Sequence, residues 1–313
     1  MPISSFDRYF LHLPPPDRKA DFNAFWDRAI AEVKKIALEP ELVKNNRKSS
    51  HRFTVYDASY KGFTRGAVTG ELLVPRKTRK PRVIIHIHDY NSPARYPQQV
   101  LEESAAYLFL TLRGHHDLVA PVEAGEDEQT PGYMIENILD RDTYYLKAVY
   151  LDVYRSIDML RLMPDVRCDA VGVFGKGIGA AAGIFIAVHS DRIAALVIDT
   201  PAFCRLPLSQ NISDSEATRE INEFIAAGKN RKKQVKDNLT YFDALNFADR
   251  IGCPVLATVG FRDTTSPPEC VFSLFNHILS EKTIEVYPDE GNRAGGNAQF
   301  KKSLEWLVAR ISG

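Results

Sequence analysis

The chain has 313 residues, of which 44% are hydrophobic and 26% are charged, and its 40 Lys and Arg residues balance 40 Asp and Glu residues. These proportions are typical of a globular domain, so they exclude a disordered chain, a collagen-like repeat and a disulfide scaffold. Because the net charge is zero, no overall field attracts a polyanion, and we expect no nucleic-acid partner.

The sequence shows no targeting or membrane-spanning pattern. Its first residues contain no basic stretch followed by an apolar core, so we expect no secretory signal and a cytoplasmic protein. No apolar run reaches the roughly 18 residues of a membrane span, and no membrane partner is expected. The four cysteines lack C-x-x-C spacing, which predicts free, buried thiols.

The first part of the chain predicts a helix followed by extended segments. Apolar residues recur at helical spacing over residues 21–37, directly after a run of prolines at 14–16. Two extended stretches follow at 53–60 and 67–75. We therefore interpret residues 1 to about 50 as an N-terminal helical extension of the main fold.

From residue 83 onward, short apolar runs alternate with segments of helix length. The runs predict strands at 83–88, 105–112, 170–174, 194–199, 255–259 and 283–287, and the segments predict helices at 142–163, 178–189, 268–279 and 298–312. This alternation predicts an α/β fold with a doubly wound, mostly parallel sheet. Residues 203–240 interrupt the rhythm, and we expect them to form a small helical insertion within a single domain that spans 1–313.

Polar residues and glycines follow several predicted strands, at the sheet edge where ligands bind in such folds. The residues in these positions are His88 to Asn91, Arg113 to His116, Gly175 to Gly179, Asp263, Asn292 and Arg293. A metal site from His88, His115 and His116 with nearby carboxylates is conceivable. However, these residues lack a compact ligand spacing, so we prefer polar loop contacts and expect no metal.

The turn from Gly175 to Ala180 joins a predicted strand to a predicted helix, and two chemistries use such a junction. Its glycines fit the dinucleotide-binding pattern G-x-G-x-x-[GA], with Asp199 placed as a ribose-binding acid. Against this, roughly 170 residues precede the turn, whereas that pattern normally opens its domain. The other chemistry is the nucleophile elbow G-x-S-x-G, but its central position is Gly177, which has no side chain.

A series of short motifs runs through the chain. They are Asp21-Phe22 with Phe25-Trp26, His88 with Tyr90-Asn91, Arg113-Gly114, Gly132-Tyr133-Met134, Ile138-Leu139-Asp140, Asp142-Thr143-Tyr144-Tyr145, Tyr241-Phe242-Asp243, Cys253-Pro254-Val255, Asp263 with Pro267-Pro268, and Val286-Tyr287-Pro288. In this order and over roughly 300 residues they resemble carbohydrate esterase family seven, the acetyl xylan esterases and cephalosporin C deacetylases. The resemblance implies an α/β-hydrolase fold and a homo-oligomer, typically a hexamer, and it argues against the dinucleotide interpretation.

The resemblance also implies where a catalytic Ser, Asp and His would lie. The Ser falls on Gly177, the Asp on Asp263 and the His on Asn292, so only the acid is retained. The oxyanion donors would be the backbone N–H groups of Tyr90 and Ile178. Losing the Ser or the His of such a unit costs about a millionfold in turnover. We therefore expect a non-catalytic homologue that needs no cofactor and binds an acylated sugar or another small ligand.

Two alternatives remain open at this stage. The first is an active acetyl esterase that uses other residues, for which Lys176 and Cys204 are the candidate nucleophiles. The second is a nucleotide- or metal-dependent enzyme at the same sheet edge. The site also departs from the family elsewhere, since Asp89 stands where a Gly is expected and His115-His116 where Gln-Gly is expected.

The retained acid needs a new partner if the histidine is lost. A buried carboxylate that loses its hydrogen-bond donor costs several kcal/mol, on the order of 3 to 5. We therefore expect Asp263 to accept a hydrogen bond from Asn292 or to form an ion pair with a nearby cation. The candidate cations are Lys176, Arg262 and Arg293.

Overall fold

The computed structural model describes residues 7–64, 66–92, 98–115 and 132–312. Within these residues a nine-stranded sheet runs in the order β1-β2-β3-β5-β4-β6-β7-β8-β9. Its strands are β1 Glu41–Lys44, β2 Phe53–Lys61, β3 Ala67–Pro75, β4 Arg82–Ile87, β5 Ala105–Thr111, β6 Arg167–Lys176, β7 Ile193–Asp199, β8 Val255–Gly260 and β9 Lys282–Tyr287. Each strand expected from the sequence is present, and β1 is an additional edge strand within the N-terminal extension.

The sheet is mostly parallel, as predicted. The strands β5, β4, β6, β7, β8 and β9 pair in parallel, whereas β1, β2 and β3 add an antiparallel wing next to β5. The chain leaves β4 for β5 on one side and later returns to β6 on the other side. Such a reversal opens a crevice at the carboxyl ends of the strands, which is where ligands bind in doubly wound sheets.

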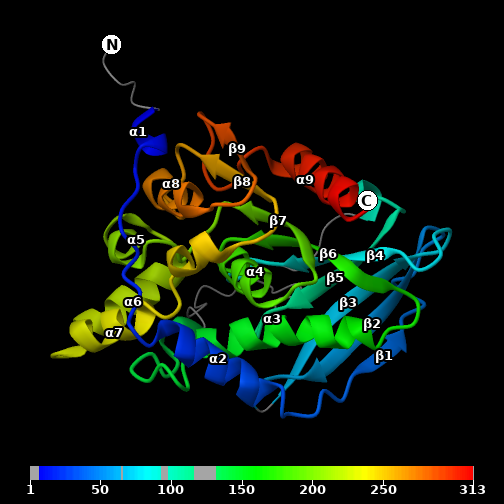
Figure 1. Ribbon diagram of the computed structural model, residues 1–313, viewed down its shortest axis with the longest axis horizontal. Helices are drawn as coiled ribbons and strands as arrows, with labels where there is room; N and C mark the ends of the chain where they lie inside the picture. Colours follow the sequence, from blue (N-terminus) through cyan, green and yellow to red (C-terminus); the bar gives the residue numbers. More distant parts are fainter. Residues whose placement is uncertain (1–6, 65, 93–97, 116–131, 313) are drawn as a thin grey trace, which may run out of the picture.

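Helices cover both faces of the sheet (Figure 1). They are α1 Asp7–Phe10, α2 Phe22–Val33, α3 Tyr145–Arg161, α4 Ile178–His189, α5 Leu206–Ile212, α6 Glu216–Ala226, α7 Arg231–Leu239, α8 Pro268–His277 and α9 Gly296–Ile311. Along β4, Ile85 faces the core shared with α3 and α4, whereas its neighbour Ile84 faces the core shared with α9. This alternation explains why the strand reads as a continuous apolar run, because both of its faces are buried.

The insertion predicted at 203–240 forms α5, α6 and α7, which gather at the side of the molecule away from β1, β2 and β3 (Figure 1). It contacts loops that follow two strands of the sheet. The Ser213 hydroxyl donates to the carbonyl of Thr265 at 2.7 Å, and the Tyr90 hydroxyl donates to Glu220 at 2.7 Å. The insertion therefore lies over the carboxyl ends of the strands.

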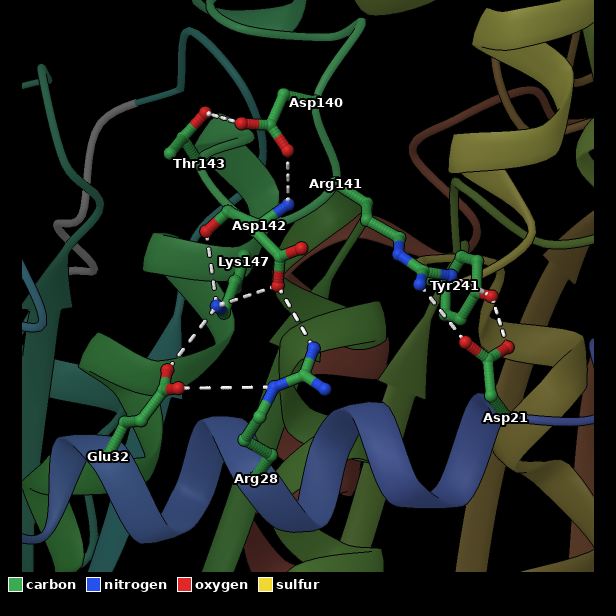
Figure 2. Close-up of polar contacts among 9 residues, drawn as sticks. All are labelled: Asp21, Arg28, Glu32, Asp140, Arg141, Asp142, Thr143, Lys147 and Tyr241. Carbon is green, nitrogen blue, oxygen red and sulfur yellow. Dashed lines mark hydrogen bonds and ion pairs between the residues drawn. The ribbon is translucent and has the colours of Figure 1, made fainter.

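A network of charged and polar side chains holds α2 to the start of α3 (Figure 2). We call it the helix clamp, and its members are Asp21, Arg28, Glu32, Asp140, Arg141, Asp142, Thr143, Lys147 and Tyr241. Arg141 lies 3.0 Å from Asp21 and its guanidinium sits 4.4 Å from the centre of the Tyr241 ring. Lys147 is only 3% exposed and lies 3.7 Å from both Glu32 and Asp142. These contacts give structural roles to several residues that carry the family resemblance.

Below the helix clamp, α2 inserts aromatic residues into the main core. Trp26 is fully buried, and its indole N–H donates to the carbonyl of Tyr241 at 3.0 Å. Its ring also packs against Phe185 and Phe242 with centroid distances of 4.6 and 5.6 Å. The N-terminal extension is therefore part of the core, because apolar aromatic burial of this kind is a major source of stability.

Candidate functional site

The glycine turn after β6 has the backbone of a strained strand-to-helix junction. Gly177 lies at φ 54° and ψ −117°, a conformation that residues with a side chain adopt only under strain. The turn also sits close to β4, since a Cβ added at Gly179 would lie 2.3 Å from the carbonyl oxygen of Ile87. This is the geometry of a nucleophile elbow, with glycine at the position that would present the nucleophile.

The carboxylate of Asp89 occupies the space above that turn. Its Oδ1 accepts hydrogen bonds from the backbone N–H groups of Tyr90 at 2.8 Å and Ile178 at 2.9 Å. A Cβ added at Gly177 would lie 1.9 Å from the Asp89 carboxylate carbon, so the two groups would share one space. The structure thus brings the two expected oxyanion donors together. Asp89 already accepts from both, so neither N–H group is open to a ligand carbonyl in this arrangement.

The surroundings of Asp89 make its ionisation less favourable than in water, but leave it a carboxylate at neutral pH. Burial raises the pKa of Asp89 to about 6, although the two backbone N–H bonds and the charge of Lys176 oppose this rise. Its second oxygen, Oδ2, receives no hydrogen bond from the described residues, and Asp89 lines a pocket. The site therefore presents a carboxylate oxygen where an esterase would present hydrogen-bond donors.

Asp263 is held by its own loop and not by Asn292 or a cation, so the expected clasp is wrong. Asp263 is 4% exposed, and its Oδ1 accepts from the backbone N–H and hydroxyl of Thr265 at 2.8 Å and from the N–H of Ser266 at 2.9 Å. Its Oδ2 is buried without a hydrogen-bond partner among the described residues. Asn292 reaches Asp263 only indirectly, by donating its amide to the Thr265 hydroxyl at 2.8 Å.

The three cations expected near Asp263 have other positions. Lys176 lies 3.1 Å from Asp199 and donates to the backbone carbonyl of Asn292 at 3.0 Å. Arg262 pairs with the exposed Asp289 at 2.7 Å, far out on the surface. Arg293 is exposed and lines a separate cavity of about 490 Å³ beside Asn292. None of the three pairs with Asp263 in the structure.

Two of the three histidines named from the sequence lie at this edge, and His116 lies outside the described residues. His88 is buried, its Nδ1 bonds the Asp89 carbonyl at 2.6 Å, and its Nε2 accepts from the N–H of Leu112 at 2.9 Å. These two bonds assign the proton to Nδ1, and burial lowers the pKa of His88 to about 4. The buried His115 packs its ring 5.4 Å from that of His88. His88 therefore positions backbone and stays neutral.

A small pocket of about 180 Å³ opens beside Asp89. Its walls come from the loops after β4, β6, β7, β8 and β9 and from the start of α6, and they consist of Asp89, Tyr90, Ile178, Ala202, Ser215, Glu216, Ala217, Thr265, Ser266 and Asn292. The sequence identified the strand ends but not the contribution of the insertion at Ser215 to Ala217. No local sequence pattern predicts that the start of α6, which is distant in the chain, lies over the strand ends.

The other candidate chemistries find little support at this edge. Cys204 is fully buried and burial raises the pKa of its thiol, which disfavours the reactive thiolate. Asp199 bonds Lys176 and Thr258, so it is already engaged. Within the described ranges, no group of three or more His, Cys, Asp and Glu side chains gathers where it could hold a metal ion.

No helix in the described part of the chain has the length and apolar character needed to cross a membrane.

A mostly parallel sheet with this glycine turn after β6, an acid after β8 and a helix-rich insertion over the strand ends defines an α/β-hydrolase fold. The family model for acetyl xylan esterase (AXE1) matches residues 1–310. The chain therefore belongs to the acetyl xylan esterase family.

Individual relatives agree with this assignment. The acetyl esterase Axe7A of Xylanibacter ruminicola is 26% identical over 307 residues, covering 93% of this chain and 67% of that protein. Among solved structures, the acetyl xylan esterase from Paenibacillus sp. R4 is 25% identical with a TM-score of 0.86, covering 98% of this chain and all of the other. Acetyl xylan esterase 1 from Thermoanaerobacterium sp. JW/SL YS485 is 25% identical with a TM-score of 0.83, covering 96% and 98% of the two chains.

Proposed function

We propose that this chain is a non-catalytic member of the acetyl xylan esterase family that binds a small molecule in the pocket beside Asp89. The observation that carries the proposal is the position of the Asp89 carboxylate against the backbone N–H groups of Tyr90 and Ile178. Ester hydrolysis in this fold needs such donors for the negative oxygen that develops in the transition state. A carboxylate that already occupies them repels that oxygen.

The nucleophile and base positions point the same way. Gly177 has no side chain that could attack an ester, and the amide of Asn292 has no basic nitrogen that could take a proton. Removing either group from such a unit lowers turnover by about a millionfold, so the residual rate is negligible for a working enzyme. In addition to binding a ligand, we expect a cytoplasmic homo-oligomer, as the sequence and the family resemblance imply.

An active esterase with unusual residues is the principal alternative. Its nucleophile would have to be Lys176 or Cys204. Lys176 is engaged by Asp199 and by the carbonyl of Asn292, and Cys204 is buried with a raised thiol pKa. Lys176 is held as a donor to two oxygens, and the raised thiol pKa of Cys204 disfavours the thiolate that would attack an ester.

The first test measures hydrolysis of p-nitrophenyl acetate by the full chain and by an Asp263→Ala variant. We expect the two rates to be indistinguishable, because the acid of an incomplete triad has no histidine to orient. A saturable rate above the control that disappears in Lys176→Met or Cys204→Ala would establish the alternative instead.

A repair experiment tests the role of Asp89 directly. The triple variant Asp89→Gly, Gly177→Ser, Asn292→His clears the oxyanion site and restores a nucleophile and a base together, so we expect measurable esterase activity. The matched double variant that keeps Asp89 should stay inactive, because the Ser side chain would collide with the carboxylate. Equal activity of the double and triple variants would show that Asp89 does not block the site.

A further inference from the structure

The pocket beside Asp89 has a one-sided charge. Of its ten lining residues, the two charged ones, Asp89 and Glu216, are both carboxylates. Glu216 is exposed at the start of α6 and accepts from the Asn91 amide at 2.6 Å, whereas Asp89 is half-buried. None of the lining residues that the structure describes is a cation that could balance them. The electrostatic character of the pocket is therefore set by Asp89.

Some buried polar atoms in residues that hydrogen-bond the pocket lining have no partner of their own among the described residues. Asp263 Oδ2 is one of them, and the other oxygen of Asp263 accepts from Thr265 and Ser266, which line the pocket. The hydroxyl of the fully buried Thr200 also lacks a partner there, and Ser266 donates to its carbonyl at 2.9 Å. Buried polar groups normally have partners, but neither of these two residues lines the pocket, so Asp89 is the buried-side acceptor that a ligand in the pocket can reach.

The cation nearest in the sequence does not supply them. Lys176 directs its ammonium group to Asp199 at 3.1 Å and to the carbonyl of Asn292 at 3.0 Å, and it does not line the pocket. The backbone N–H groups of Tyr90 and Ile178 are likewise used, since each donates to Asp89 Oδ1. What remains facing the cavity is the Oδ2 acceptor of a carboxylate.

We infer that this pocket binds a small organic cation whose ammonium N–H groups donate to Asp89. The inference rests on the proposed function and specifies its ligand. An ammonium group has three donors and no acceptor, and its hydrogen bonds to a carboxylate are among the strongest in proteins. The cavity of about 180 Å³ limits the ligand to a small molecule. A neutral acyl group would instead place its carbonyl oxygen against a carboxylate, which is unfavourable.

An organic cation fits this site better than a hard metal ion. Calcium and magnesium take about six or more oxygen ligands, several of them carboxylates at close range. Within the described residues, no group of three or more His, Cys, Asp and Glu side chains forms such a set. One carboxylate oxygen inside the pocket, with the carboxylate of Glu216 at its rim and otherwise uncharged described lining, suits one ammonium group with an apolar body.

The experiment compares ligands of matched shape on the full chain at pH 7.5. Cyclohexylammonium, cyclohexanol and cyclohexanecarboxylate share one ring and differ in charge, and their binding is measured by titration with NMR detection. We expect cyclohexylammonium to bind about tenfold or more tightly than cyclohexanol, the usual size of a charge-assisted hydrogen bond, and the carboxylate to bind least. Equal binding of the first two probes, or tighter binding of the carboxylate, would overturn the inference.

Variants locate the effect in the pocket. Asp89→Asn turns the acceptor that faces the cavity into an amide and should remove the preference for cyclohexylammonium. Asp289→Asn makes the same change in an exposed ion pair outside the pocket and should preserve the preference. If Asp89→Asn does not fold, Glu216→Gln should reduce the preference by a factor of about two to three, as expected for an exposed charge at the pocket rim. An unchanged preference in Asp89→Asn or, failing that, in Glu216→Gln would refute the assignment.

The esterase assay separates this inference from the proposed function. Ammonium preference together with ester hydrolysis would overturn the non-catalytic proposal and leave the cation site intact. Absence of both would leave the non-catalytic proposal intact and overturn the cation site.

Discussion

In the helix clamp, the cations Arg141 and Lys147 each lie within 4 Å of a carboxylate (Figure 2), whereas the described lining of the pocket beside Asp89 contains two carboxylates and no cation. The two regions also differ in whether their buried charged groups have hydrogen-bond partners. Lys147 is buried but donates to the carbonyl of Asp142, while Asp263 is buried with one oxygen unpartnered in the described residues. The charges of the helix clamp have complementary partners, whereas the carboxylates in and next to the pocket are only partly hydrogen-bonded within the described residues.

The difference shows that part of the family resemblance depends on residues outside the site. Asp21, Asp142 and Tyr241 carry part of the family resemblance, and the structure explains them by contacts that join α2 to the segment before α3. Asp140, which also belongs to the resemblance, bonds Asp142 and Thr143 within that segment. None of these residues lines the pocket beside Asp89. A chain can therefore keep the fold and its signature while the pocket changes its chemistry, because function resides in the site and not in the fold.

The largest effect is expected at the base of the helix clamp. Trp26→Ala removes a fully buried indole that packs on Phe185 and Phe242, and we expect a loss of about 3 to 5 kcal/mol in the free energy of unfolding. Urea denaturation measures this loss. Trp306→Ala is the matched control, because Trp306 is only half-buried on α9 and should cost clearly less. Equal losses would show that α2 is not part of the main core.

A smaller effect of opposite sign is expected in the pocket. The pKa of Asp89 is raised from 3.8 to about 6 in the folded chain, so the folded chain binds this proton more tightly than the unfolded chain. Ionisation of Asp89 therefore lowers the free energy of unfolding as the pH rises from about 4 to about 6, and the loss is complete above that range. Asp89→Asn avoids this loss.

We expect the stability of Asp89→Asn relative to the original chain to increase by about 2 kcal/mol between pH 4 and pH 7.5. Urea denaturation at a series of pH values measures the difference. A difference that stays constant over this range, or that falls as the pH rises, would mean that the pocket does not disfavour the carboxylate. Such a result would also mean that the charge of Asp89 in the pocket is compensated as well as the charges in the helix clamp are.

The smallest effect is expected at an exposed ion pair that lies outside both the helix clamp and the pocket. Arg262 and Asp289 form an ion pair at 2.7 Å, but their side chains are 70% and 84% exposed. Such pairs contribute little, so Arg262→Ala should change the free energy of unfolding by less than about 0.5 kcal/mol. It should also leave cyclohexylammonium binding unchanged. A loss comparable to that of Trp26→Ala would show that charges outside the helix clamp also hold the fold.

Much of the fold could be predicted from the sequence because central parallel strands are buried on both faces. Their apolar runs place β4 and β7 within one residue of the observed starts. The strand β1 was missed, since Glu41–Lys44 is a short edge strand with mostly exposed side chains and no apolar pattern. Helix α3 was predicted to start at residue 142, but it begins at Tyr145, because Asp140 bonds the backbone and hydroxyl groups of the intervening residues.

The site was only partly predictable. Strand ends identified Asp89, Gly177 and Asp263, but the placement of a carboxylate on the N–H groups of another loop depends on how two turns meet in space. The sequence next to Asp263 does contain a pattern that predicts its hydrogen-bond partners. An Asp followed by Thr265 and Ser266 commonly accepts hydrogen bonds from the backbone two and three residues later, which is the arrangement found.

The burial of Trp26 also constrains when this protein can finish folding during its synthesis. The indole N–H bonds a residue 215 positions later, and Arg18 pairs with Asp249, 231 positions later. On the ribosome, at about 5 to 20 residues per second, the part of the docking site of α2 that contains Tyr241 and Phe242 is missing for roughly ten seconds or more after α2 emerges. During that interval its aromatic residues are exposed, so the nascent chain is the state in which this protein most needs protection from aggregation.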